Sequence, residues 1–287
     1  MSRLVRAAVG RSLTFGDATV SYVPDGVGAL IPEVFLPTVD WHRYPQHLAA
    51  DGTLVASLGG LLVQRDGSTL LIDTGYGPGP AFEGPDATAR GLGPFRGGAL
   101  LDNLAQFGVS PSDVDTVVVT HVHFDHVGWL VHRDRPGHPP VFPSARYLVA
   151  EPEWAFCRSH GDKYGQLDQE TFFGPLGELV ETFARGAEIF PGVTALPTPG
   201  HTPGHTSFVL AGGGRELVVV GDAAHNPVEL EHPEHGARRD SAPAAARASR
   251  ELLADLLARP DTVGYGMHFA DVVLGTLDDG HWVPVDA

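Results

Sequence analysis

The sequence alternates short apolar segments with turns that are rich in glycine and proline. Residues 19–23 alternate apolar and polar positions, which predicts a strand that ends at the turn signal Pro24-Asp25-Gly26. Residues 61–75 contain two apolar runs joined across Asp66-Gly67, which predicts a β-hairpin. Apolar and β-branched runs predict further strands at residues 113–120, 146–150, 192–198, 262–269 and 271–277, and two strands joined by a glycine loop within 206–222.

Helical periodicity is present in three places. Residues 98–108 space apolar side chains as a helix does and end in a glycine, a second helix begins at residue 151, and residues 241–259 carry the longest helical pattern. Strands interleaved with helices predict a layered α/β protein. Because no low-complexity linker divides the chain, we interpret residues 1–287 as a single domain. Residues 28–52 have no clear period, and we expect them to form a lid or one wall of a binding pocket.

Composition narrows the classes of protein to which the chain can belong. Its 287 residues, 43% of them hydrophobic, suffice for a substantial core, and no apolar run reaches the roughly 18 residues of a membrane span. A net charge of −16 opposes contact with a phosphate backbone, so we expect neither nucleic acid nor a membrane as a partner. A single cysteine, Cys157, excludes an intrachain disulfide. Together with the lack of an apolar leader at the N-terminus, this predicts a cytoplasmic protein.

The densest group of titratable side chains follows a β-branched run. The stretch VVVTHVHFDHVGWL, residues 117–130, places His121, His123, Asp125 and His126 within six residues. Side chains alternate along a strand, so His121 and His123 at its carboxyl end should point to the same side. Imidazole is the usual nitrogen ligand for zinc and related metals. This spacing favours a metal site over a loop of solvated histidines.

Further metal-binding side chains follow other predicted strands. His201 and His205 lie in the loop TPGHTPGHTSF, Asp222 follows the strand that ends in VVVG, and His268 follows GYGM. Because the carboxyl ends of several strands can converge on one edge of a sheet, we expect these side chains to meet those of the H-x-H-x-D-H stretch. Neither G-x-S-x-G nor a reactive-cysteine motif occurs, so the sequence offers no serine or cysteine nucleophile.

These motifs resemble the metallo-β-lactamase superfamily. H-x-H-x-D-H, TPGHTPGH, the glycine–aspartate pair after a strand, the late isolated histidine and LIDTG stand in the order of the family across residues 60–270. The resemblance implies an α/β fold of the αββα sandwich type, in which two mixed β-sheets pack face to face with helices on the outside. It also implies a first metal held by His121, His123 and His201, a second metal held by Asp125, His126 and His268, and Asp222 as a bridge between them.

The resemblance further implies the roles of residues around the ligands. Asp73 falls where the family has an aspartate that orients the site, and His205 falls where it has a residue that supports the site without binding a metal. Two divalent metal ions are implied, with zinc as the first expectation and manganese, iron or cobalt as options that such ligands also accept. Two ions lower the pKa of a shared water and hold it as a bridging hydroxide, which predicts metal-assisted hydrolysis. We expect Asp125, Asp222 and His225 to carry the catalysis.

Within the superfamily, the sequence resembles the lactonase and methyl-parathion-hydrolase-like group. The stretches HFDHVGWL, TPGHTPGHTS and GDAAHNPVELEHPE carry this resemblance. Lactonases of the group typically have a tyrosine three residues after the bridging aspartate, whereas this chain has His225, which resembles the organophosphate hydrolases. His225 can donate a hydrogen bond to the substrate or serve in packing, and the sequence leaves both roles open. The resemblance favours hydrolysis of a carboxylic ester or lactone, with phosphotriesters and thioesters as alternatives.

The remaining predictions concern the pocket and the partners. Phe35, Trp41, Tyr44 and Trp129 are predicted to form an apolar wall, which implies a small-molecule substrate with an apolar portion. Residues 226–240 are predicted to form a loop near the mouth of the pocket. Two functions of other kinds stay open, an iron-dependent oxidase and a metal-binding protein without catalysis. The oligomeric state also stays open, with a homodimer as one option.

Overall fold

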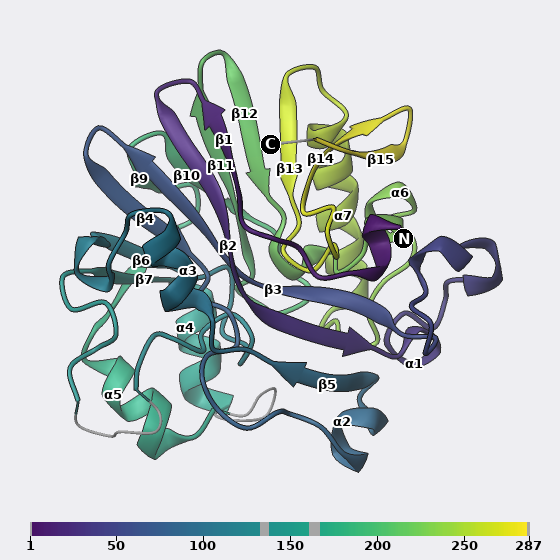
Figure 1. The fold of residues 1–287 in the computed structure, drawn as a ribbon, viewed down its shortest axis with the longest axis horizontal. Helices are drawn as coiled ribbons and strands as arrows, with labels where there is room; N and C mark the ends of the chain where they lie inside the picture. Colours follow the sequence, from purple (N-terminus) through teal and green to yellow (C-terminus); the bar gives the residue numbers. More distant parts are fainter. Residues whose placement is uncertain (1, 133–137, 161–166, 286–287) are drawn as a thin grey trace.

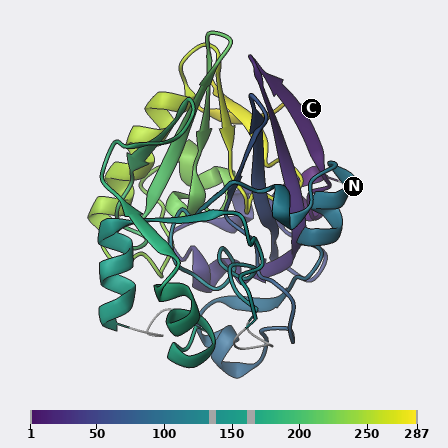
Figure 2. The same cartoon turned by 90° about the vertical axis from the view of Figure 1, so that its left-hand side faces the viewer.

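The fold consists of two β-sheets packed face to face, with helices on the outer surfaces (Figure 1). The computed structural model describes residues 2–132, 138–160 and 167–285. Figure 2 shows the two sheets nearly edge-on, with helix α7 (Pro243–Leu257) on the outside of the C-terminal sheet. The αββα sandwich with mixed sheets that the sequence implies is confirmed.

The first sheet contains the N-terminal strands. They are β1 (Arg11–Phe15), β2 (Ala18–Leu30), β3 (Leu54–Arg65), β4 (Ser68–Ile72), β5 (Leu92–Arg96), β6 (Thr116–Val118), β7 (Arg146–Ala150) and β8 (Val180–Phe183). Their order in the sheet is β1-β2-β3-β4-β6-β7-β8, and β5 pairs with β2 outside this path. The pairs from β4 to β8 are parallel, and the other pairs are antiparallel, so the sheet is mixed.

The second sheet contains the C-terminal strands. They are β9 (Glu188–Phe190), β10 (Val193–Pro197), β11 (Thr206–Gly212), β12 (Arg215–Val219), β13 (Thr262–Tyr265), β14 (Leu274–Asp278) and β15 (His281–Pro284). Their order is β15-β14-β13-β12-β11-β10-β9. Only β12 and β13 run parallel among these paired strands, which brings their carboxyl ends to the same edge of the sheet.

The helices are short apart from two. They are α1 (Pro32–Phe35), α2 (Pro85–Ala89), α3 (Leu100–Gln106), α4 (Glu151–His160), α5 (Gly174–Gly177), α6 (Pro227–Glu231) and α7. Single turns of 3-10 helix span Arg3–Val5, Trp41–Arg43, Pro45–His47, Pro111–Asp113 and Gly221–Ala223, and a π-helical turn spans Gln169–Phe173. Within residues 2–132, 138–160 and 167–285, no helix has both the length and the apolar composition that a membrane span requires.

Alternating side chains build apolar layers on both faces of each sheet. On β12, Leu217 and Val219 belong to the core between the sheets, whereas Val218 faces outward and joins Leu253 of α7 in an outer core. In the first sheet, Leu62 of β3 likewise belongs to a core on the outer face, beneath α3 and α4. Full burial of one such side chain stabilises the fold by about 1.5–3 kcal/mol. The two sheets therefore form a rigid base for the loops at their edge.

The predicted turn at Pro24-Asp25-Gly26 is wrong, because these residues lie inside β2. The register between β2 and β3 shifts between Pro24 and Gly26, so Asp25 is the extra residue of a β-bulge. The bulge turns the Asp25 carboxylate into the protein, where it is buried and ties several loops together. It accepts hydrogen bonds from the backbone N–H groups of Tyr76, Gly77, Gly98 and Leu100 and from the indole N–H of Trp129.

Other element boundaries also differ from the predictions. The segment 28–52 begins as the end of β2 and continues into α1 and two 3-10 turns, so it is less irregular than expected. The strands expected at 113–120 and 262–269 are shorter, since β6 ends at Val118 and β13 ends at Tyr265. In both places the chain leaves the sheet before it reaches the histidines. These histidines therefore lie in loops.

Candidate metal centre

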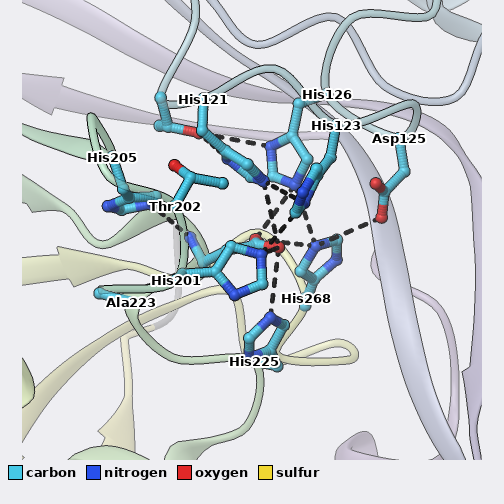
Figure 3. Close-up of polar contacts among 12 residues, drawn as sticks. His121, His123, Asp125, His126, His201, Thr202, His205, Ala223, His225 and His268 are labelled. Atoms are coloured by element: carbon cyan, nitrogen blue, oxygen red, sulfur yellow. Dashed lines mark hydrogen bonds and ion pairs between the residues drawn. The ribbon is translucent and has the colours of Figure 1, made fainter. Parts of the chain in front are cut away.

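The predicted ligands lie at one edge of the sandwich, where the carboxyl ends of parallel strands meet. β4 and β6 run parallel in the first sheet, as β12 and β13 do in the second. Asp73 follows β4 and the H-x-H-x-D-H stretch follows β6, while Asp222 follows β12 and His268 follows β13. His201 lies in the loop between β10 and β11. Figure 3 shows side chains from these separate loops converging on one centre.

Four side chains form a first group of potential metal ligands. Donor atoms of His121, His123, His201 and Asp222 all lie within 4.8 Å of one another. The Nε2 atoms of His121 and His201 lie 2.8 Å and 3.1 Å from Nδ1 of His123. All four residues are buried. Three imidazoles and one carboxylate are a donor set that suits a tetrahedral zinc ion.

Three further side chains form a second group. Donor atoms of Asp125, His126 and His268 also lie within 4.8 Å of one another. The Nε2 atoms of His126 and His268 are 3.3 Å apart, and Oδ2 of Asp125 is 3.7 Å from Nε2 of His268. In Figure 3 Asp125 approaches the histidine rings from one side. The structure thus brings together all seven predicted ligands in the two sets that the resemblance implies.

Asp222 connects the two groups. Its Oδ1 lies 3.1 Å from Nε2 of His126 and 3.0 Å from Nε2 of His268. Its Oδ2 lies 3.6 Å from Nε2 of His121 and 3.4 Å from Nε2 of His201. Burial alone would raise the pKa of Asp222, but the surrounding imidazoles hold it well below its usual value. One oxygen of an ionised carboxylate therefore faces each group, as a bridging ligand requires.

The arrangement fits two divalent metal ions. Burial lowers the pKa of His121 and His123 well below the usual value, which favours the neutral imidazole that a metal ion requires. The buried Oδ1 of Asp222 has no hydrogen-bond partner in the part of the chain that the structure describes. Seven donors exceed the four that a single tetrahedral ion binds. Imidazole and carboxylate together accept zinc, manganese, iron or cobalt.

A turn, rather than strand geometry, makes the rings of His121 and His123 face each other. The expected alternation along a strand does not apply, because β6 ends at Val118. The N–H of His126 instead donates to the carbonyl of His123 at 3.0 Å and closes a turn. The N–H and hydroxyl of Thr120 donate to the Asp73 carboxylate at 2.8 Å and 2.9 Å. Asp73 thus anchors the start of the ligand loop.

Two ligands of the second group are held through the ring nitrogen that points away from the centre. Nδ1 of His126 donates to Oδ2 of Asp73 at 2.9 Å. Nδ1 of His268 donates to the backbone carbonyl of Ser57 at 3.0 Å. A proton held on the outward nitrogen leaves the inward nitrogen free to bind a metal and fixes the orientation of the ring. Asp73 therefore contacts the site in the way expected of an orienting aspartate.

Asp240 supports His201 in the same manner, although it was not among the predicted site residues. Its Oδ1 accepts from Nδ1 of His201 at 3.3 Å, and its Oδ2 accepts from the buried guanidinium of Arg250 on α7 at 3.0 Å. Burial alone would raise the pKa of Asp240, but the hydrogen bond from His201 and the nearby positive charges hold it below its usual value. No local motif marks Asp240, because it contacts a ligand 39 residues away.

His205 contacts the backbone of a ligand rather than the centre itself. Its Nε2 accepts from the N–H of Asp222 at 2.9 Å, and its Nδ1 donates to the carbonyl of Thr198 at 3.1 Å. Burial lowers the pKa of His205 to about 3, so the ring is neutral. Gly221 has a φ of 59°, and a Cβ there would lie 2.6 Å from Nε2 of His205, so the close approach requires glycine. His205 thereby fixes the position of Asp222.

Glu153 of α4 joins the two loops that carry the histidines of the first group, and it was not among the predicted site residues. Its Oε1 accepts from the N–H of Val122 at 3.0 Å. Its Oε2 accepts from the hydroxyl of Thr202 at 2.7 Å and from the N–H of Gly204 at 3.1 Å. Burial raises the pKa of Glu153, and the hydrogen bonds from these donors oppose that shift. The helix was predicted from sequence, but a buried glutamate on it gave no signal of this contact.

His225 lies between two carboxylates beside the centre. Its Nε2 is 3.2 Å from Oδ2 of Asp222, and its Nδ1 is 3.5 Å from Oε2 of Glu229. Burial alone would lower the pKa of His225, but the two carboxylates outweigh it and raise the pKa to about 10. The ring of Phe35 packs edge-on against it, with ring centroids 4.8 Å apart. Both carboxylates favour a protonated imidazole at this position.

The loop predicted at 226–240 begins with a helix instead, and this helix places Glu229. Asn226 caps α6, and the N–H of Asn226 donates back to the Glu229 carboxylate, which completes a capping box. The N–H of His225 donates to the same carboxylate at 2.6 Å. The pattern Asn-Pro-Val-Glu is a capping signal that could have located both the helix and Glu229 from sequence.

A cavity lined by both polar and apolar side chains opens onto the centre. Metal-ligand candidates and His225 provide its polar surface, and Arg239 also lines it. Its apolar wall is formed by Leu30, Phe35, Ala56, Leu92, Phe95 and Phe124.

Of the four residues predicted to form the apolar wall, Phe35 lines the cavity. The described residues that line the cavity do not include Trp129, Trp41 or Tyr44. The indole N–H of Trp129 donates to Asp25 at 2.7 Å, and Trp41 is buried with its ring 6.3 Å from that of Tyr44. The prediction that these three aromatic residues form the cavity wall is therefore wrong.

Comparison with known proteins agrees with this geometry. A family model described as the metallo-beta-lactamase superfamily matches residues 60–266. A probable metallo-hydrolase of Mycobacterium bovis is 29% identical over 223 residues, which cover 67% of this chain and 63% of that protein. The N-acyl homoserine lactonase AttM of Agrobacterium fabrum is 29% identical over 150 residues, which cover 48% of this chain and 50% of that protein. The chain thus spans less than two thirds of the length of these curated relatives.

A solved structure is similar over nearly the whole chain. AidC, a dizinc quorum-quenching lactonase in complex with a product, superposes with a TM-score of 0.81 at 21% sequence identity and covers 99% of both chains. At this identity the similarity establishes the fold alone.

Proposed function

The chain belongs to the metallo-β-lactamase superfamily, and we propose that it is a hydrolase with two divalent metal ions that cleaves a carboxylic ester or lactone. The observation that carries the proposal is the pair of ligand groups joined by the two oxygens of Asp222. The lactonases among its relatives and structural neighbours support the ester or lactone class, and the dizinc state of one of them supports zinc.

The side chains divide the work between holding ions and positioning the substrate. When bound, two divalent ions supply a water of lowered pKa and polarise the carbonyl oxygen of the substrate. The cavity wall holds the apolar portion of the substrate and excludes bulk water from the reacting bond. The residues that would hold the ions are His121, His123 and His201 for one, Asp125, His126 and His268 for the other, and Asp222 for both.

We assign to His225 the role of a hydrogen-bond donor to the substrate. Its ring lines the cavity and lies against Asp222, while Glu229 holds it from the opposite side. When the carbon–oxygen bond of the ester breaks, Nε2 of His225 can give its proton to the departing alkoxide. A donor fixed in this way stabilises charge that develops in the transition state.

Phosphotriester hydrolysis is the second candidate, and the histidine at position 225 favours it. The reaction needs the same activated water, polarised oxygen and apolar recess. The first candidate ranks higher because lactonases stand among the curated relatives and the structural neighbours.

A substrate panel with fully metallated enzyme tests the proposal. Lactones, aryl esters, thioesters and phosphotriesters are compared by kcat/KM, and we expect esters or lactones to be the best substrates. Elemental analysis should find two metal ions per chain, one for each ligand group. Turnover of thioesters without any turnover of esters or lactones would overturn the substrate class. Redox-active iron with oxygen consumption would indicate an oxidase, and a metallated protein inactive on the whole panel would be a metal-binding protein.

Substitution of His225 tests its assigned role. His225→Phe should lower kcat by about 10²-fold or more while the metal content stays constant. The loss should be larger for poor leaving groups, because these depend most on protonation. His225→Gln, which keeps a donor, should retain part of the activity on good leaving groups. A His225→Phe enzyme as active as wild type on its best ester would remove this residue from the mechanism.

A further inference from the structure

We infer that Ser57 is a positioning residue for the second metal ion, because it holds the loop that follows His268 in a conformation that alanine rarely adopts. The inference deepens the proposed function and rests on one part of it, the assignment of a second ion to Asp125, His126 and His268. It does not depend on which reaction the two ions support.

Ser57 contacts His268 with its backbone and the loop after His268 with its side chain. It lies on β3 and is fully buried. Its carbonyl accepts the hydrogen bond from Nδ1 of His268 at 3.0 Å, and its hydroxyl donates to the carbonyl of Ala270 at 2.8 Å. The hydroxyl oxygen also accepts from the N–H of Ala8 at 2.8 Å, so its own proton is free to point at Ala270. One buried residue therefore holds both the ligand ring and the backbone two residues after it.

The backbone of Ala270 has an uncommon conformation. Its φ is 46°, in the left-handed region that residues with a side chain seldom adopt. Among the described residues, the other non-glycine residues with a positive φ are all aspartates. Aspartate tolerates this region because its short polar side chain can form hydrogen bonds with the nearby backbone, whereas alanine has no such group. A strained residue of this kind persists only where the surrounding structure holds it.

The peptide groups on both sides of Ala270 are held by hydrogen bonds. On one side, the N–H of Ala270 donates to the carbonyl of His268 at 2.8 Å. On the other side, the carbonyl of Ala270 accepts from Ser57. The N–H of Asp271, which belongs to the same peptide group as that carbonyl, donates to the carbonyl of Arg3 at 3.1 Å. Ala270 is also buried, so water cannot replace these partners easily. Together these contacts fix the backbone angles of Ala270.

The conformation of Ala270 determines where the imidazole of His268 lies, because the turn at Ala270 closes on the His268 backbone. With the loop held, Nε2 of His268 lies 3.0 Å from Oδ1 of Asp222 and 3.3 Å from Nε2 of His126. We expect a change of Ala270 to a negative φ to displace His268 from these two residues. Contacts that orient a ligand typically affect metal affinity by about 10- to 100-fold. The Ser57 hydroxyl therefore contributes to binding of the second ion.

Calorimetric titration of the metal-free protein with zinc tests the inference. Ser57→Ala removes the hydroxyl and keeps the carbonyl that His268 contacts. It should lower the affinity for the second zinc ion by about 10-fold or more. The binding event of the second ion is identified with His268→Ala, which should abolish it. The other binding event should stay as in wild type in Ser57→Ala, because the histidines of the first ligand group lie on other loops.

A rescue variant and a control variant separate positioning from general stability. Glycine adopts a positive φ without strain, so Ser57→Ala combined with Ala270→Gly should recover most of the zinc affinity that Ser57→Ala loses. Ser21→Ala is the control, because it removes another buried serine hydroxyl, which contacts Oγ of Ser12 at 2.7 Å on the neighbouring strands. It should bind both zinc ions as wild type does. Urea unfolding of the metal-free proteins measures the stability of each variant separately.

The outcomes separate this inference from the proposed function. A loss confined to the second ion and recovered by Ala270→Gly would support the inference. Wild-type affinity in Ser57→Ala, an equal loss for both ions, or a loss that Ala270→Gly does not recover would overturn it and leave the two-ion centre intact. A single binding event in wild type would overturn both. If Ser57→Ala does not fold, Ser57→Cys, which keeps a weak donor of similar shape, serves in the same comparison and should show a smaller loss.

Discussion

The two ligand groups of the metal centre are held by different parts of the molecule. The three histidines of the first group lie on two loops that Glu153 of α4 joins, and Asp240 accepts a hydrogen bond from His201. Asp240 is in turn bound by Arg250 of α7. Two helices on the outside of the sandwich therefore support this group through buried carboxylates. We expect the first group to resist displacement, because the buried carboxylates of Glu153 and Asp240 each have several hydrogen-bond partners.

The second group takes ligands from both sheets, as the first does, but one of its ligand loops is tied to the N-terminal segment. Its His126 follows β6 of the first sheet, whereas its His268 follows β13 of the second. The loop that carries His268 continues into Asp271, which is buried. The Asp271 carboxylate pairs with the guanidinium groups of Arg3, Arg6 and Arg11, and the N–H of Asp271 donates to the carbonyl of Arg3 at 3.1 Å.

The two ligand groups differ in which segments of the chain support them. The partners of the first group lie on α4, α7 and their adjoining loops, which are packed against the sheets. Arg3, Arg6 and Arg11 hold Asp271, three residues after His268, so we expect displacement of the N-terminal segment to disturb the second group more than the first. Arg6 is the most exposed of the three arginines, with 54% of its side-chain surface accessible, so the ion pairs with Asp271 are partly open to solvent. We therefore expect the second group to release its ion first when a chelator is added.

Substitution of Asp222 should have the largest effect, because this residue belongs to both groups. Asp222→Ala removes the oxygen that faces each group and should lower kcat/KM by about 10³-fold or more. It should also lower the metal content measured by elemental analysis. His205→Ala is the control, because it removes only the support of the Asp222 backbone and should cost about 10- to 100-fold. Equal losses in the two variants, with full metal content in both, would show that Asp222 is not the bridge.

A matched pair of substitutions can separate the two groups. Asp240→Asn should weaken binding of the first ion and Asp271→Asn should weaken binding of the second, each by about 10-fold or more. Calorimetric titration of metal-free protein with zinc resolves the two binding events, and chelator titration gives the order of release. Asp271→Asn should leave the first binding event as in wild type. If both variants weaken the same ion, the contrast between the groups is wrong.

The ligands could be predicted from the sequence because their residue types are rare and their spacing is local. Four of them occupy one stretch of six residues, Asp222 and His268 follow apolar runs, and His201 lies in a loop with a repeated Thr-Pro-Gly-His pattern. Asp240 and Glu153 escaped prediction because aspartate and glutamate are common and their contacts join distant segments. The fold class followed from the resemblance. Strand ends were overestimated where β-branched residues continue into a ligand loop, as at Val119.

The cavity wall was harder to predict than the centre. Leu92 and Phe95 lie on β5, within a segment whose glycines and prolines conceal a strand. Aromatic residues are equally suited to a core and to a wall, and sequence alone does not tell on which side of a loop each will lie. Trp129 illustrates this, since its indole N–H is engaged by the buried Asp25. That contact depends on a bulge inside β2 that the sequence suggested was a turn.

Substitution of His47 should have the smallest effect on the metal centre, because His47 belongs to neither ligand group. His47 is 5% exposed and packs with Trp41 and Tyr44 at ring-centroid distances of 6.4 Å and 6.0 Å. Burial lowers the pKa of His47 to about 4, against an ordinary value of 6.5. Between these values the unfolded chain binds a proton that the folded chain does not, so the stability that His47 contributes falls as pH falls from 6.5 to about 4. The full loss is up to about 3 kcal/mol.

His47→Gln cannot take up this proton, so the variant should lose less stability on acidification than wild type does. Urea unfolding of both proteins over this pH range gives the difference in their free energies of unfolding. Because His47 lies in a 3-10 turn of the 28–52 segment and is absent from both ligand groups, the difference should follow the same curve with and without bound metal. A difference that vanishes when the metal is removed would mean that the turn and the centre are coupled. The segment 28–52, which carries Phe35, would then support the two ligand groups together with the helices and the N-terminal arginines.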